Sequence, residues 1–140
     1  GGDAALAHRL RPILCVGEKT RNDEIWENAV KEQVVVATRG ISRTRIADLI
    51  IAYEPVWAIG TGIPDTPDSA LSAAILIRKT IAKLFSNNAA RTIPILYGGS
   101  VTEKNAAGFM AQEGIDGFLV GGASLRAGEF AHIAEIVADS

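Results

Sequence analysis

The segment that decides the fold spans residues 49–62 and reads LIIAYEPVWAIGTG. Its first part, residues 49–53, is almost wholly apolar and predicts a buried strand of a parallel sheet. Glu54 follows that strand directly. Because chemistry in α/β proteins gathers at the carboxyl ends of strands, Glu54 is a candidate general base beneath a loop that opens and closes. For an isolated glutamate, a solvated loop residue is the alternative interpretation.

The rest of the chain repeats this pattern of strand followed by helix. Apolar segments predict three further strands, at about 13–16, 93–97 and 117–120. Helical periodicity predicts helices around residues 4–10, 26–37, 67–85, from 102 onward, and 130–137. The alternation indicates a parallel sheet with right-handed crossovers. The order of elements leaves two architectures open, half of a (β/α)8 barrel and a four-stranded doubly wound sheet.

Local signals predict where the helices begin and end. Thr66 is the expected N-cap of the longest helix, with Pro67 at its first position. Asn87 and Asn88 are expected to end that helix, and Gly40 to cap the helix before it. The residues that the longest helix is expected to bury are Leu71, Ala74, Ile77, Ile81 and Leu84.

The composition is that of an ordinary globular domain, with 140 residues, of which 48% are hydrophobic and 21% charged. The net charge of −2 gives no reason to expect nucleic acid or a membrane surface as a partner. No apolar run approaches the roughly 18–20 residues of a membrane span. The single cysteine, Cys15, excludes an internal disulfide, and a small buried core residue is expected there rather than a nucleophile. No His or Cys cluster has metal-ligand spacing.

The first residue is Gly1 and the only methionine is Met110, which indicates a processed, tagged or fragmentary chain. A complete (β/α)8 barrel needs about 250 residues. If the architecture is a barrel, we therefore expect the chain to hold about half of it.

Glycines cluster after three of the predicted strands. Glycine lets backbone N–H groups approach an anion closely, and convergent amides at a helix N-terminus form a phosphate site. The alternative is that these glycines only make tight turns, but their repetition favours phosphate binding. The residues concerned are Gly60, Gly62, Gly98, Gly99, Gly121 and Gly122.

Three motifs together resemble the triosephosphate isomerase family, in that family's order. YEPVWAIGTG at 53–62 is similar to its catalytic glutamate and closing loop, and YGGSV at 97–101 and LVGGASL at 119–125 are similar to its phosphate loops. CVGE at 15–18 resembles the loop after the family's fifth strand. The resemblance covers essentially the whole chain and implies an α/β fold, with residues 1–140 forming one domain. That domain would be the C-terminal half of a TIM barrel, about four βα units, with the N-terminal half absent.

The resemblance also implies an activity and a set of site residues. Glu54 would interconvert dihydroxyacetone phosphate and D-glyceraldehyde 3-phosphate through an enediol(ate), in glycolysis and gluconeogenesis, without a metal or cofactor. The substrate phosphate would be held by Gly60, Ser100, Gly121 and Gly122. The lid and its support would be Pro55, Val56, Trp57, Ile59, Glu18, Tyr97 and Leu119. Among these, Glu18 would receive Trp57 when the lid shuts, with an exposed loop acid as the alternative, and Ile59 and Leu119 would keep water from Glu54.

The chain departs from the family pattern in two ways. The far hinge of the lid reads Ile63-Pro64-Asp65 where the family usually has Lys-Thr-Ala, and a proline there fixes φ and removes a donor. The electrophilic histidine and lysine of the family mechanism are also absent, because His8 and His132 fall in helices and Lys19 is expected to be a solvated loop residue. We therefore expect the chain alone to be inactive, and a non-catalytic phosphate-binding half barrel is the alternative function.

The expected partners are a triose phosphate and another barrel half. An open half barrel exposes two sheet edges and its inner face, so self-association or pairing with a complementary half is expected. The resemblance implies a homodimer for the complete protein and a cytoplasmic location.

Overall fold

The computed structural model of the chain describes residues 13–21, 25–58, 65–99 and 103–118. Four strands form one parallel sheet in the order β1-β2-β3-β4. Their bounds are Ile13–Val16 for β1, Ile50–Tyr53 for β2, Ile95–Tyr97 for β3 and Gly117–Phe118 for β4. All four predicted strands are present, but β2 begins one residue later than the predicted 49–53 and β3 two residues later than the predicted 93–97, because Ile93 caps the helix that precedes β3. Residues 119 and 120 of the fourth predicted strand lie outside the described residues.

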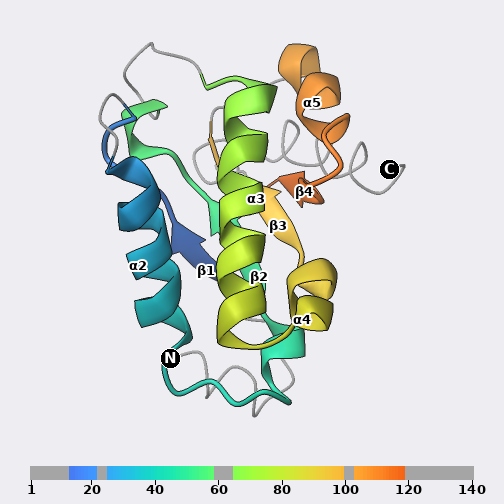
Figure 1. Cartoon of the computed structure of the whole chain (residues 1–140). Helices are drawn as coiled ribbons and strands as arrows, with labels where there is room; N and C mark the ends of the chain where they lie inside the picture. The colour runs from blue at the N-terminus through green and yellow to red at the C-terminus, as the bar shows by residue number, and fades with distance from the viewer. Residues whose placement is uncertain (1–12, 22–24, 59–64, 100–102, 119–140) are drawn as a thin grey trace.

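The helices that follow the strands lie on one side of the sheet. Figure 1 shows α2, α3 and α5 in front of the strands, with α4 at the lower end of α3. Their bounds are Trp26–Thr38 for α2, Pro67–Leu84 for α3, Asn87–Thr92 for α4 and Glu103–Met110 for α5, and the short 3-10 helices are η1 at Ile46–Asp48 and η2 at Val56–Ala58. The helices predicted around 4–10 and 130–137 lie outside the described residues.

The strand order of the sheet decides between the two architectures that the order of elements along the chain left open, and it agrees with the half barrel that the loop motifs implied. Right-handed crossovers that always step in the same direction place every helix on one face, as observed here. A doubly wound sheet reverses direction at a switch point and carries helices on both faces. The chain therefore has the winding of consecutive units of a (β/α)8 barrel.

The predicted helix caps around α2 and α3 are confirmed. The Thr66 hydroxyl accepts a hydrogen bond from the Ser69 N–H at 3.1 Å, and Pro67 occupies the first helical position. Gly40 follows the C-cap of α2 with φ at 81°, a left-handed conformation that glycine adopts without a Cβ penalty.

The longest helix ends at Leu84 with Phe85 as its C-cap, as predicted, but two expectations about the residues near its end are wrong. Leu84 is 37% exposed rather than buried, because it lies in the last turn, beyond the part of α3 that faces the sheet. Asn87 begins α4 instead of only ending α3. The reason is Ser86, whose hydroxyl accepts the Ala89 N–H at 3.0 Å and so starts a new helix. Leu71, also expected to be buried, is only half-buried.

The core lies between the sheet and the helices. Alternate strand residues supply its sheet side, and the small and branched residues of α2 and α3 pack on them. The Tyr97 ring stacks on Phe109 of α5 with 4.2 Å between ring centroids. The strand residues of this core are Val16, Ile51, Tyr53, Ile95 and Tyr97.

Cys15 is exposed, so the prediction of a buried core cysteine is wrong. Successive strand residues point to opposite faces. Val16 points into the core, and Cys15 and Ile13 therefore lie on the other face, where Ile13 is 41% exposed.

Among the described helices, none combines the length and the apolar character needed to cross a membrane.

Candidate active site

Glu54 lies at the carboxyl end of β2, between the ends of β1 and β3. Its N–H donates to the carbonyl of Val16 at 2.7 Å, and the Tyr53 carbonyl accepts the Gly98 N–H at 2.8 Å. These backbone bonds extend both strand pairings to the point where the glutamate emerges. The predicted position of the glutamate, directly after a strand and at the sheet's carboxyl edge, is therefore confirmed.

Two glycines make room for Glu54. A Cβ on Gly98 would lie 2.5 Å from Cγ of Glu54, and a Cβ on Gly17 would overlap the backbone carbonyl of Glu54. Real Cβ atoms do not approach other atoms so closely, so both positions need glycine. The sequence assigned Gly98 to the phosphate loops and gave Gly17 no role, so the steric role of both was missed.

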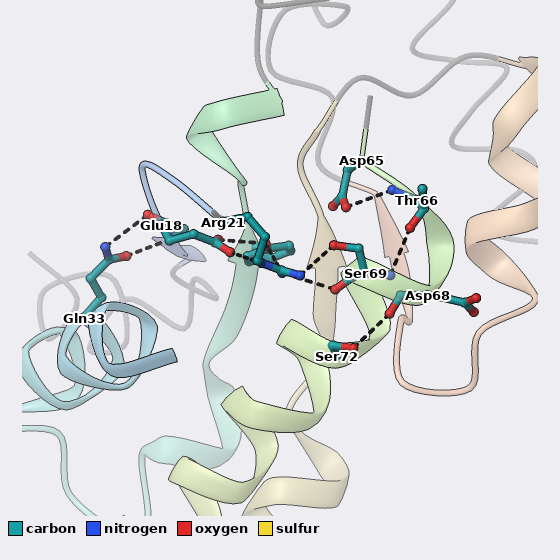
Figure 2. A network of polar contacts seen from close by, with 10 residues as sticks. Glu18, Arg21, Gln33, Asp65, Thr66, Asp68, Ser69 and Ser72 are labelled. Atoms are coloured by element: carbon teal, nitrogen blue, oxygen red, sulfur yellow. Dashed lines mark hydrogen bonds and ion pairs between the residues drawn. The ribbon is translucent and has the colours of Figure 1, made fainter. Parts of the chain in front are cut away.

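Glu18 is buried, with 1% of its surface exposed, so the alternative of an exposed loop acid is wrong. Its Oε1 accepts a hydrogen bond from the Tyr53 hydroxyl at 2.7 Å, and its Oε2 accepts one from Nε of Arg21 at 2.6 Å. Figure 2 shows the side chains of Glu18 and Arg21 next to one another. A buried carboxylate needs such a charged partner. Burial of the Tyr53 hydroxyl is the main cause that raises the pKa of Tyr53, and the hydrogen bond to Glu18 raises this pKa further.

Arg21 is a site residue that sequence reasoning missed. Its Nη1 donates to the Ser69 hydroxyl at 2.7 Å, and its Nη2 donates to the Tyr53 hydroxyl at 3.0 Å and to the Ser69 carbonyl at 3.3 Å (Figure 2). The guanidinium carbon lies 3.7 Å from the centre of the Trp26 ring. The sequence signal was only an arginine three residues after an acid, which is common in loops.

Gln33 of α2 fixes the loop that carries Glu18. Its Oε1 accepts the Gly17 N–H at 2.7 Å, and its Nε2 donates to the Gly17 carbonyl at 3.0 Å. Because one side chain satisfies both backbone groups, the loop after β1 is attached to α2 immediately before Glu18.

The described part of the predicted lid begins with a buried Pro55 and continues into η2. The Val56 N–H donates to the Glu18 carbonyl at 3.1 Å. The centre of the Trp57 ring lies 5.8 Å from the guanidinium carbon of Arg21. The contact of Trp57 with Glu18 that is expected when the lid closes remains a prediction.

Several predicted site residues lie outside the described residues. They are Ile59, Gly60, Ser100, Leu119, Gly121 and Gly122. Tyr97, predicted to support the lid, is buried within the core, where burial raises its pKa, with a further contribution from Asp65. Lys19 is exposed, as expected.

Cys15 lies close to Glu54. Cys15 is exposed as a residue, but partial desolvation of its thiol by the neighbouring groups raises the pKa of the thiol, and the charge and hydrogen bonding of Glu54 raise that pKa further. The thiolate is the nucleophilic form of cysteine, so this environment works against nucleophilic chemistry at Cys15. Among the residues that the structure describes, no three His, Cys, Asp or Glu side chains gather in a way that could hold a metal ion.

Asp65, the described residue of the altered hinge, is buried at the start of α3. Its Oδ1 accepts the Thr66 N–H at 2.8 Å. Burial raises its pKa above the ordinary value of 3.8, and outweighs the lowering by hydrogen bonds from Ser69 and Thr66 and by the charge of Arg21. The folded protein therefore holds the Asp65 proton to higher pH than the unfolded chain does.

Asp65→Asn is expected to raise the free energy of unfolding at pH 7. As the pH rises above 3.8, the unfolded chain releases the Asp65 proton first, so the wild type loses stability up to the higher folded pKa. Asparagine keeps the oxygen that accepts the Thr66 N–H and carries no charge. The gain should therefore disappear below the unfolded pKa, which urea unfolding from pH 3 to pH 8 would measure.

Asp68→Asn is the matched control for this prediction. Asp68 is exposed in the first turn of α3, where a negative charge favours the helix. Its replacement should slightly lower the free energy of unfolding at pH 7. A gain for Asp65→Asn that is equal at every pH, or a loss at pH 7, would contradict the stated role of the buried charge.

The fold and site define an α/β protein of the (β/α)8-barrel class, with a carboxylate at the carboxyl end of a strand. The family model of triosephosphate isomerase matches residues 2–137. Three similar proteins bear that name: one from Roseiflexus sp. (strain RS-1), 51% identical over 132 residues, one from Caldanaerobacter subterraneus subsp. tengcongensis, 48% identical over 132 residues, and one from Bifidobacterium longum (strain DJO10A), 47% identical over 139 residues. The chain belongs to the triosephosphate isomerase family.

The alignments cover nearly all of this chain and half of each relative. They include 93% of the chain for the first two relatives and 98% for the third, but 52%, 53% and 52% of the relatives themselves. The chain thus spans about half the length of the curated relatives it matches.

Proposed function

We propose that the complete protein to which this chain belongs is a triosephosphate isomerase, and that the chain supplies its C-terminal half. The observation that carries the proposal is the place of Glu54, which leaves β2 at the sheet's carboxyl edge with glycine on both sides. Membership of the family supports the same reaction. The substrates are dihydroxyacetone phosphate and D-glyceraldehyde 3-phosphate, and we place the reaction in cytoplasmic glycolysis and gluconeogenesis.

In this proposal, Glu54 moves one proton between two adjacent carbons. Its carboxylate takes a proton from the carbon next to the substrate carbonyl, which leaves an enediol(ate), and then returns the proton to the neighbouring carbon. The backbone amides of Gly60, Ser100 and Gly122, with Gly121 beside them, hold the phosphate. No metal or cofactor takes part in this proton transfer.

The proposed site needs two further parts, an apolar cover over Glu54 and an electrophile. Ile59 and Leu119 cover Glu54 and exclude water, which favours the neutral form of the carboxylate. The electrophile that polarises the substrate carbonyl comes from the remaining half of the barrel. This division accounts for the absence of a histidine or buried lysine beside Glu54 among the described residues.

The test compares the 140-residue chain alone with the chain joined to the remaining half of the Roseiflexus relative. We expect isomerisation by the joined protein and none by the chain alone, measured with a coupled assay for glyceraldehyde 3-phosphate. A calorimetric titration with a phosphorylated enediolate mimic accompanies the assay. If neither protein isomerises the substrate but the chain binds the mimic, the function is phosphate binding without catalysis.

The described surface also supports the proposal that this chain associates with another barrel half. β1 is an edge strand of the described sheet. Apolar side chains on β1, on α2 and just before α2 are exposed there, namely Ile13 at 41%, Val36 at 52% and Ile25 at 64%. A groove of about 480 Å³ lies there, lined in part by Cys15, Ala29 and Val36. We expect the chain to form a dimer or larger assembly. Light scattering that shows only a 14.8 kDa monomer would contradict this.

A further inference from the structure

The side chain of Arg21 connects segments that are far apart in the sequence and meet beside Glu54. It bonds Glu18 in the loop after β1, Tyr53 at the end of β2 and Ser69 in the first turn of α3, and it lies over Trp26 of α2. Figure 2 shows it between the loop that carries Glu18 and the start of α3. A planar fork with several donors suits such a junction.

The donors of Arg21 are directed at protein acceptors. The guanidinium donates to Glu18 Oε2, to the Tyr53 hydroxyl and to both the hydroxyl and the carbonyl of Ser69. The side chain is 19% exposed, and the Glu18 side chain is 1% exposed. This is the arrangement of a group that holds protein segments in place, and it is unlike a substrate-binding arginine with its fork turned to solvent.

Glu18, which Arg21 fixes in place, is hydrogen-bonded to the chain on both sides of Glu54. Its carboxylate accepts the hydroxyl of Tyr53, the residue just before Glu54. Its backbone carbonyl accepts the N–H of Val56, two residues after Glu54. Without the guanidinium, Glu18 would lose the ion pair that the described residues give it, and a buried carboxylate without that partner would move or take up a proton. The two segments that flank Glu54 would then lose a common support.

We propose that Arg21 is a positioning residue for Glu54 and acts through Glu18 and Tyr53, without contact with the substrate. The inference rests on the proposed role of Glu54 as the base that moves the substrate proton. Arg21 then contributes to turnover by holding the carboxylate where it meets the substrate carbon, since misplacement of a reacting group by about 1 Å can cost about 10²-fold in rate.

The first experiment uses the complete protein, formed by joining the chain to the remaining half of a relative. Arg21→Met is expected to lower kcat and kcat/KM together by about 10- to 100-fold, with KM little changed, because the lost interaction acts in the transition state. Arg21→Lys keeps the charge without the fork and should fall between the wild type and Arg21→Met. If kcat for Arg21→Met equals that of the wild type, the proposal is overturned.

The matched control is Arg78→Met. Arg78 also donates to four acceptors, but these lie in the segments that precede β3 and β4, away from the carboxyl edge of the sheet. Its replacement should lower the melting temperature and leave the kcat of the folded protein unchanged. If kcat falls as much for Arg78→Met as for Arg21→Met, the effect of Arg21 is general loss of structure and the proposal fails.

The second experiment reads the position of Glu54 without turnover. In the 140-residue chain labelled with 13C at glutamate side chains, the Glu54 carboxylate signal is assigned by its loss in Glu54→Gln. Arg21→Met should shift or broaden that signal at constant pH, and Arg78→Met should not. If Arg21→Met does not fold, Arg21→Lys and Ser69→Ala carry both measurements. An unmoved Glu54 signal in these variants would overturn the proposal.

The two experiments separate this inference from the proposed function. If the wild-type complete protein does not isomerise triose phosphates while the Glu54 signal responds to Arg21, the proposed function fails and the positioning role stands. If the wild type is active and neither kcat nor the Glu54 signal responds to Arg21, the proposed function stands and the positioning role fails.

Discussion

Glu54→Gln is expected to lower kcat for triose phosphate interconversion by about 10²–10⁴-fold in the complete protein, the usual contribution of a positioned acid or base. Glutamine has nearly the same shape and cannot take up the substrate proton. The backbone bond from the Glu54 N–H to Val16 and the glycines on either side do not depend on the carboxylate. The change should therefore remove the chemistry and leave the fold.

Measuring phosphate affinity shows whether Glu54→Gln removes only the proton transfer or also disrupts the binding site. Since the phosphate is proposed to bind backbone amides elsewhere, affinity for inorganic phosphate should change little in Glu54→Gln, as measured by competition against the substrate. Glu113→Gln, at an exposed position after α5, is the control and should retain wild-type kcat. Unchanged turnover in Glu54→Gln would remove Glu54 from the mechanism.

The parts of the fold that follow from local sequence could be predicted. Apolar runs located the strands, because a parallel strand covered by helices must be apolar. Thr66, Pro67 and Gly40 marked helix ends, because caps act over only a few residues. The choice between a barrel half and a doubly wound sheet could not be made from element order, because it depends on the direction of each crossover in space.

The candidate site was predictable where chemistry follows a strand, and not where it depends on packing. Glu54 was located by its place after an apolar run. Arg21 was missed because its contact with Ser69 joins residues 48 positions apart, and no local pattern indicates it. The same holds for the close approach of Gly98 to Glu54, which arises only when β2 and β3 pair. Glu18 was located, but its burial could not be read from the loop sequence.

Arg78 attaches α3 to the segments that lead into β3 and β4. Its Nη1 donates to the carbonyls of Ala90 at 2.7 Å and Ile93 at 2.9 Å, and its Nη2 donates to the Gly114 carbonyl at 3.0 Å and Asp116 Oδ2 at 2.7 Å. The same oxygen of Asp116 accepts the Ile95 N–H at 2.8 Å. One side chain thus donates to three backbone carbonyls and one carboxylate in the segments that lead into β3 and β4.

Arg78→Met is expected to lower the free energy of unfolding by about 2–4 kcal/mol, because several partly buried carbonyls lose a charged donor at once. The 21% exposure of Arg78 and the 43% exposure of Asp116 let water compensate in part, which keeps the loss below the sum of four bonds. Urea unfolding followed by circular dichroism measures the change.

Two further variants show whether geometry or charge carries this stabilisation. Arg78→Lys keeps the charge, but a lysine ammonium cannot reach acceptors on both sides as a planar fork does, so most of the loss should remain. Arg43→Met removes an exposed arginine and should stay within about 0.5 kcal/mol of the wild type. If Arg78→Lys restored full stability, the charge of Arg78 would be sufficient. If Arg78→Met matched Arg43→Met, the attachment of α3 to β3 and β4 would depend on apolar packing alone.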